Sequence, residues 1–123
     1  DKIVFKIIFY SINIITKMGL DWIMSTKTEY LEAYRGKNVG LILTMNGHLD
    51  EANECYGEEC YLTDHNIINI RNALEKIKKK GYSDKTYLEV TTTAEEEKEV
   101  VEEALEFLEK ALIDTGKEIH CSY

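Results

Sequence analysis

The stretch that decides the fold is residues 85–123, KTYLEVTTTAEEEKEVVEEALEFLEKALIDTGKEIHCSY. It opens with Lys85–Thr91, whose alternating residues are typical of a half-buried strand. Residues 93–96 (TAEE) form a capping box, in which a hydroxyl and a carboxylate satisfy free backbone N–H groups at the start of a helix. That helix keeps an apolar face and ends before Gly116. Residues 117–123 predict a last short strand, so the whole stretch has the length of a βαβ unit with two parallel strands.

A second amphipathic helix is predicted directly before this stretch. Thr63 or Asp64 serves as its N-cap, and it ends at about Lys80 because Gly81 follows. Its apolar face is formed by residues at helical spacing, namely Ile67, Ile70, Leu74 and Ile77. The lysines near its end complement the negative end of the helix dipole; they are Lys76, Lys78, Lys79 and Lys80.

The residues before position 63 give weaker signals. Asp21–Ser25 (DWIMS) predicts a short strand, and Glu29–Tyr34 predicts one helical turn. Arg35–Asn38 has the composition of a turn, and Val39–Thr44 (VGLILT) has that of a strand. Residues 48–64 are polar and are predicted to form a loop.

Together these elements predict an α+β fold. Two amphipathic helices cannot cover each other and also bury four or five strands on both faces. We therefore expect a two-layer sandwich, with both helices packed on one face of a mixed four- to five-stranded sheet and Trp22 as a core anchor. A chain of 123 residues has the length of one domain, and residues 18–123 are assigned to it.

Residues 1–17 leave three alternatives open. Residues 3–15 (IVFKIIFYSINII) are apolar and rich in β-branched side chains, which favours a buried strand. Met18 could be the natural start, which would make residues 1–17 an upstream extension outside the fold. The third alternative is a targeting or membrane segment. This thirteen-residue segment, which Lys6, Ser11 and Asn13 interrupt, is too short for a helix to span about 30 Å of hydrocarbon, so we expect no membrane partner.

The formal net charge of −8 is unevenly distributed. Residues 1–40 carry six basic and four acidic side chains, whereas residues 41–123 carry nine basic and nineteen acidic ones. An acidic surface of this size repels phosphate, which argues against a nucleic acid as the partner. Three cysteines leave one unpaired in any disulfide scheme, which favours a reducing, intracellular compartment.

The sharpest chemical feature is a cluster of cysteine and histidine. Cys55, Cys60 and His65 follow one another with four residues between them, and Cys121 could supply a fourth ligand if the last strand passes beneath the loop. Thiolates and imidazole suit a tetrahedral zinc ion, so a zinc- or thiol-dependent module is one hypothesis. A Cys55–Cys60 disulfide and ordinary structural thiols are the alternatives. No catalytic residue is assigned, because His120 and Cys121 are adjacent and would point to opposite faces of a strand.

Two further groups of side chains are predicted to lie on the surface. Tyrosine is abundant, with eight residues, and Tyr56 and Tyr61 flank the loop cysteines. Tyrosine-rich loops give a large contact area at low entropic cost, so these two residues are predicted to bind a partner. A row of glutamates in the first turn of the C-terminal helix is predicted to be a solvated face that the helix dipole favours; it comprises Glu95, Glu96, Glu97 and Glu99.

Residues 18–22 (MGLDW), followed by residues 34–37 (YRGK), resemble the start of small proteins of bacteriophages and large DNA viruses that open with Gly-Leu-Asp-Trp. That group has no assigned activity, so the resemblance transfers no functional residue. It implies a viral protein, which would act in the host cytoplasm.

The leading prediction is therefore a small acidic accessory protein that binds another protein and needs no cofactor. The alternative is the zinc or thiol module. The sequence names no partner and sets no oligomeric state.

Overall fold

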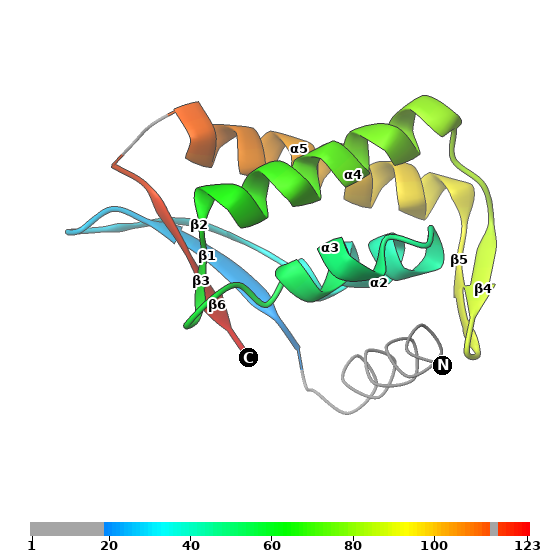
Figure 1. The fold of residues 1–123 in the computed structure, drawn as a ribbon, viewed down its shortest axis with the longest axis horizontal. Coiled ribbons are helices and arrows are strands. Elements are labelled where there is room, and N and C mark those ends of the chain that lie inside the picture. Colours follow the sequence, from blue (N-terminus) through cyan, green and yellow to red (C-terminus); the bar gives the residue numbers. More distant parts are fainter. Residues whose placement is uncertain (1–18, 114–115) are drawn as a thin grey trace.

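The computed structural model describes residues 19–113 and 116–123, which form an α+β fold (Figure 1). This confirms the predicted fold class. The described residues contain a four-stranded sheet, a separate two-stranded sheet and four helices. The predictions for residues 1–17 lie outside the described residues. Among those that are described, no helix combines the length and the apolar character needed to cross a membrane.

The four-stranded sheet has the strand order β2-β1-β6-β3, and all neighbouring strands are antiparallel. Its strands are β1 (Asp21–Ser25), β2 (Tyr30–Tyr34), β3 (Tyr61–Leu62) and β6 (Glu118–Ser122). The predicted strands at residues 21–25 and 117–123 are confirmed as β1 and β6. The sheet is not mixed, because β6 pairs with β1 and β3 and not with a parallel strand from residues 85–91.

Residues 29–34 were predicted as a helical turn, which is wrong, because Tyr30–Tyr34 is strand β2. Trp22 on β1 pairs with Tyr34 on β2, and both rings lie against Phe107 of the last helix, at centroid distances of 6.2 and 5.8 Å. A three-ring cluster of this kind stabilises the hairpin through contacts that are distant in sequence. Local spacing alone does not show them.

Residues 35–44 were predicted as a turn and a strand, and this is also wrong, because Gly36–Met45 forms helix α2. Its buried residues Val39, Ile42 and Leu43 follow the i, i+3, i+4 spacing of a helix face. The apolar run is too short for its period to separate a strand from a helix. Gly36 is required at the start of α2, since a Cβ there would lie 2.6 Å from the Trp22 indole nitrogen.

Residues 48–64 are not all loop. They contain helix α3 (Leu49–Glu54) and a tight turn that leads into β3. In this turn Glu58 and Tyr61 exchange two backbone hydrogen bonds of 2.7 and 3.1 Å, and Glu59 and Cys60 have φ values of 51° and 69°. Positive φ at both central residues is the geometry of a two-residue hairpin turn, which non-glycine residues adopt with strain.

Residues 85–92 form a small hairpin and not one strand. Strand β4 (Lys85–Tyr87) pairs with β5 (Val90–Thr92) across a two-residue turn, Leu88-Glu89, with φ values of 45° and 66°. The hairpin forms a separate two-stranded sheet and does not join the larger one. It stands at the end of the molecule opposite that sheet (Figure 1).

The two predicted amphipathic helices are confirmed as α4 (Asp64–Lys80) and α5 (Ala94–Ile113). Thr63 caps α4 and Thr93 caps α5, each through a reciprocal pair of hydrogen bonds with the residue three positions later. The helices lie side by side over one face of the sheet (Figure 1). That face supplies fully buried side chains to the core, Trp22, Met24, Ile119 and Cys121.

Candidate functional site

The three cysteines come together where β6 passes the segment between α3 and α4. The backbone N–H of Cys121 donates to the carbonyl of Cys60 at 2.7 Å. The thiol of Cys121 lies 3.7 Å from the carbonyl of Cys55. All three residues are free cysteines, so the Cys55–Cys60 disulfide is not formed.

The three thiols differ in their access to solvent. Cys55 and Cys121 are buried, whereas Cys60 is exposed. Burial, followed by the nearby Cys121, raises the pKa of Cys55 well above its ordinary value. Burial, followed by the nearby Cys60, raises the pKa of Cys121 from 9.0 to about 12. Cys55 and Cys121 therefore stay protonated at neutral pH and pack as small apolar groups, while Cys60 is the accessible thiol.

His65 does not complete a metal site with these thiols. It lies in the first turn of α4, where its ring nitrogen is 3.1 Å from the amide nitrogen of Asn69. Among residues 19–113 and 116–123, no group of three or more His, Cys, Asp and Glu side chains is placed to hold a metal ion. The structure gives the zinc hypothesis no support.

The two tyrosines that were predicted to bind a partner lie in different surroundings. Tyr61 is 48% exposed, and its ring centroid is 5.3 Å from that of His120, a neighbour across the sheet. Tyr56 is half-buried and lies edge-on to Tyr123 at 5.7 Å. Tyr61 is therefore available on the surface, whereas Tyr56 packs partly against the core.

A groove runs along α5, and the sequence did not predict it. It consists of three adjacent hollows with volumes of about 360, 200 and 180 Å³. The first two share Asn38, Glu96 and Val100, and the first and third share Tyr34 and Glu103. We call the three hollows together the α5 groove.

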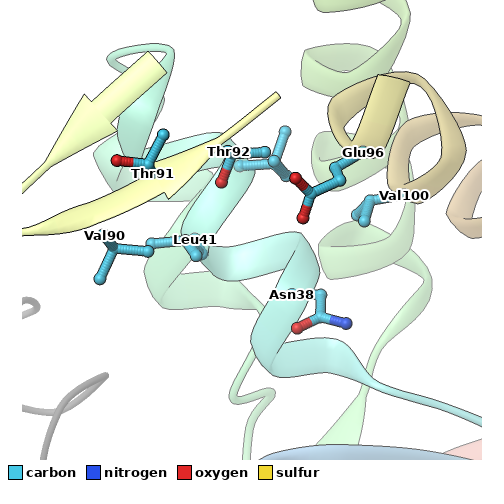
Figure 2. A pocket seen from close by; sticks show the side chains of 8 residues that line it. Asn38, Leu41, Val90, Thr91, Thr92, Glu96 and Val100 are labelled. Atoms are coloured by element: carbon cyan, nitrogen blue, oxygen red, sulfur yellow. The ribbon is translucent and has the colours of Figure 1, made fainter. Parts of the chain in front are cut away.

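Figure 2 shows the 200 Å³ hollow at one end of the α5 groove. Asn38 and Leu41 of α2 form one side, and Glu96 and Val100 of α5 form the other. Strand β5 closes the end of the hollow with Val90, Thr91 and Thr92. Both apolar and polar side chains line it.

The α5 side of the groove is acidic. Its carboxylates recur at intervals of three and four residues, which places them on one side of the helix; they are Glu96, Glu99, Glu103 and Glu106. Two cations line the groove, and acidic residues pair with both: Lys110 lies 3.1 Å from Glu32, and Arg35 lies 3.6 Å from Asp21. The negative charge therefore exceeds the positive charge along the groove.

Tyr34 marks the centre of the groove. Its hydroxyl donates to the carbonyl of Val100 at 3.2 Å. Burial, followed by the charge of Glu103, raises the pKa of Tyr34 far above its ordinary value. The phenol therefore remains neutral and anchors β2 to α5 as a hydrogen-bond donor.

Glu97 overturns the prediction that the glutamates at the start of α5 are all solvated. Its side chain is fully buried, and both carboxylate oxygens accept from the Lys85 ammonium at 2.8 Å. It also accepts from the Asn46 amide at 3.0 Å and from the Ser83 backbone N–H at 3.3 Å. Asn46 caps α2 and Lys85 belongs to β4, so this one carboxylate holds the hairpin and α2 against α5. Helix α2 and strand β5 of the hairpin both form walls of the groove.

Comparison with known proteins found no matching family model, no matching curated sequence and no matching solved structure. The resemblance to phage and viral proteins therefore stays a prediction. The geometry of the site carries the functional argument.

The acidic row could have been found in the sequence. Glu96, Glu99, Glu103 and Glu106 have helical spacing in a helix that was correctly predicted. The opposite wall could not be found, because α2 was predicted to be a strand. Without that helix, no surface opposite the glutamates could be predicted.

Proposed function

We propose that this chain is a small accessory protein, of viral origin, that acts by binding another protein. The α5 groove receives a basic, partly apolar segment of that partner. The observation that carries the proposal is the row of four glutamates along three adjoining hollows that apolar residues also line. The proposal follows the predicted function of protein binding and assigns it to a defined surface.

The dimensions of the groove set the size of the segment. Glu96 and Glu106 are ten residues apart on α5, which corresponds to about 15 Å along the helix axis. An extended peptide covers that distance with roughly five residues. The half-buried Leu41 and Val100 offer apolar contacts, while the glutamates offer charge to lysine or arginine side chains.

Electrostatics favour a basic partner in two ways. The groove lies on an acidic body with a formal net charge of −8, which speeds the encounter with a cationic segment. The same charge disfavours phosphate-bearing ligands. Binding is therefore expected to weaken as the salt concentration rises.

The test uses a fluorescein-labelled ten-residue peptide of alternating lysine and leucine, with fluorescence polarisation as the readout. The variant Glu99→Gln/Glu103→Gln removes two groove charges and should weaken binding about fivefold, or about 1 kcal/mol, at the upper end for exposed charges. The control Glu75→Gln/Glu95→Gln removes the same net charge from exposed residues outside the groove and should have less effect. Equal weakening in the two variants, or no binding to the native chain, would refute the proposal.

Tyr61 supports a second contact area for the same function. It is exposed on the sheet face that α4 and α5 do not cover, next to His120. Tyrosine supplies contact area with few rotatable bonds, so this position suits an interface. A Tyr61→Ala variant in the polarisation assay separates this contribution from that of the groove.

A further inference from the structure

We propose that Cys60 and Cys121 form a reversible disulfide when the protein meets a peroxide. The proposal concerns a modification site on the sheet and does not depend on the α5 groove. It would link the turn before β3 to the C-terminal strand β6.

The sheet register places the two residues opposite each other. Strand β3 pairs with β6 through Tyr61 with His120 and Leu62 with Ile119, so Cys60 and Cys121 are the next pair outward. The hydrogen bond of 2.7 Å from the Cys121 N–H to the Cys60 carbonyl extends the ladder to this pair. Cys60 itself belongs to the Glu58–Tyr61 turn, with a φ of 69°, so this backbone hydrogen bond is what holds it beside Cys121. The Cα atoms of a hydrogen-bonded antiparallel pair are about 5.5 Å apart, and a disulfide requires about 4.4–6.8 Å.

The two side chains also lie near the same end of β6. The Cys60 sulfur is 3.9 Å from the hydroxyl of Tyr123, which follows β6 two residues after Cys121. The nearness of Cys60 also contributes to the raised pKa of Cys121.

Cys55 is excluded as the partner of Cys60 by the direction of its side chain. Its thiol donates to the carbonyl of Glu51 in its own helix, at 3.5 Å. Its side chain is fully buried, so an oxidant in solution reaches Cys60 first. The structure thus offers one exposed thiol with one buried thiol opposite it.

The reaction balances with one peroxide molecule. The Cys60 thiolate attacks one oxygen of hydrogen peroxide, the O–O bond breaks, and a sulfenic acid forms as water leaves. The Cys121 sulfur then attacks the Cys60 sulfur, the S–O bond breaks, the S–S bond forms and a second water leaves. Two thiols lose two electrons and two protons in total, and the peroxide is reduced to two waters. Because the pKa of Cys121 is about 12, the second step is the slower one, and dimedone should trap the sulfenic acid.

The experiment treats the reduced full chain with hydrogen peroxide and measures intact mass and linked peptides by mass spectrometry. The expected result is a loss of about 2 Da, with a peptide that joins Cys60 to Cys121 and separates again under dithiothreitol. An oxygen adduct on Cys60 without a linked peptide overturns the proposal. So do a Cys55–Cys121 link, a disulfide-linked dimer and an unchanged mass.

Two variants sharpen this result. Cys60→Ser changes an exposed residue and should abolish the mass loss, because the remaining thiols are buried. Cys55→Ala should retain the Cys60–Cys121 link. Retention of the mass loss in Cys60→Ser would contradict the proposal even if the Cys55 variant failed to fold.

Discussion

Removal of the Lys85 ammonium, which pairs with the buried Glu97 carboxylate, should destabilise the protein strongly. Both Glu97 oxygens accept from Lys85 at 2.8 Å, and Asn46 and Ser83 each donate one further hydrogen bond. A Lys85→Met variant leaves the carboxylate buried without a counter-charge. The loss of one partner of a buried pair costs about 3–5 kcal/mol. The two remaining donors place our expectation near the lower end, at about 3 kcal/mol.

Neutralising Glu97 should destabilise the protein less than removing the Lys85 ammonium. This difference distinguishes the loss of a counter-charge from the loss of a hydrogen bond. Lys85 keeps 20% of its side chain exposed, whereas Glu97 is fully buried. In a Glu97→Gln variant the ammonium can still reach water, so we expect a loss of about 1–2 kcal/mol. The double variant Lys85→Met/Glu97→Met removes both charges and should be more stable than Lys85→Met alone, with a coupling energy of about 2 kcal/mol.

Urea unfolding is the appropriate assay, because Trp22 is the chain's single tryptophan and is fully buried. Its fluorescence reports loss of the core, and the m-value shows whether the unfolding transition itself has changed. Arg71→Met is the control, since it breaks a more exposed pair with Glu109 and should cost less than about 1 kcal/mol. If Lys85→Met cost no more than Arg71→Met, Glu97 would not depend on its counter-charge.

Three further predictions concern packing, backbone strain and pH. Gly36→Ala should lower the free energy of unfolding by about 1–3 kcal/mol and shift the emission of Trp22, because the new methyl group meets the indole ring. Urea unfolding measures the first effect and fluorescence emission spectra measure the second. Leu88→Asn/Glu89→Gly should raise the free energy of unfolding by about 1 kcal/mol in the same assay, because asparagine and glycine tolerate the positive φ values of these two turn positions. An unchanged urea midpoint would show that the turn carries little strain. Stability should fall above pH 9, because the thiol of Cys121 ionises near 9.0 when unfolded but only near pH 12 when folded, so the unfolded chain loses its proton first. The slope from this thiol is about 1.4 kcal/mol per pH unit, and a Cys121→Ala variant measured over the same range should show a shallower decline.

The long helices were predictable because their signals are local. The cap at Thr93 and the apolar faces of α4 and α5 lie within single elements, and the structure confirms them. The strands at residues 21–25 and 118–122 were found for the same reason, since alternation is visible within five residues.

The errors occur where distant contacts override local pattern. Val39–Thr44 is rich in β-branched and aliphatic residues but forms a helix, because its apolar side chains pack at helical spacing into the core. Tyr34 belongs to a strand because it pairs with Trp22, which lies on another element. The burial of Glu97 could not be predicted, since its partner Lys85 lies twelve residues away on a hairpin that was predicted as one strand.

The candidate site was also predictable only where its signals are local in the sequence. The four glutamates of the α5 groove were visible in the sequence, but the groove depends on α2 and β5, both of which were predicted in a different form. The convergence of Cys60 and Cys121 depends on the pairing of β3 with β6, which a parallel βαβ arrangement would not produce.

The position of β6 has a consequence for how the chain is made in the cell. β6 lies between β1 and β3, so β1 lacks this neighbour until residues 118–122 have left the ribosome. During that interval the nascent chain has Trp22 and Met24 on a strand whose sheet is incomplete. Contacts between residues so far apart in sequence form slowly, because a long loop must close first. Chaperone capture of the nascent chain should therefore persist until β6 emerges.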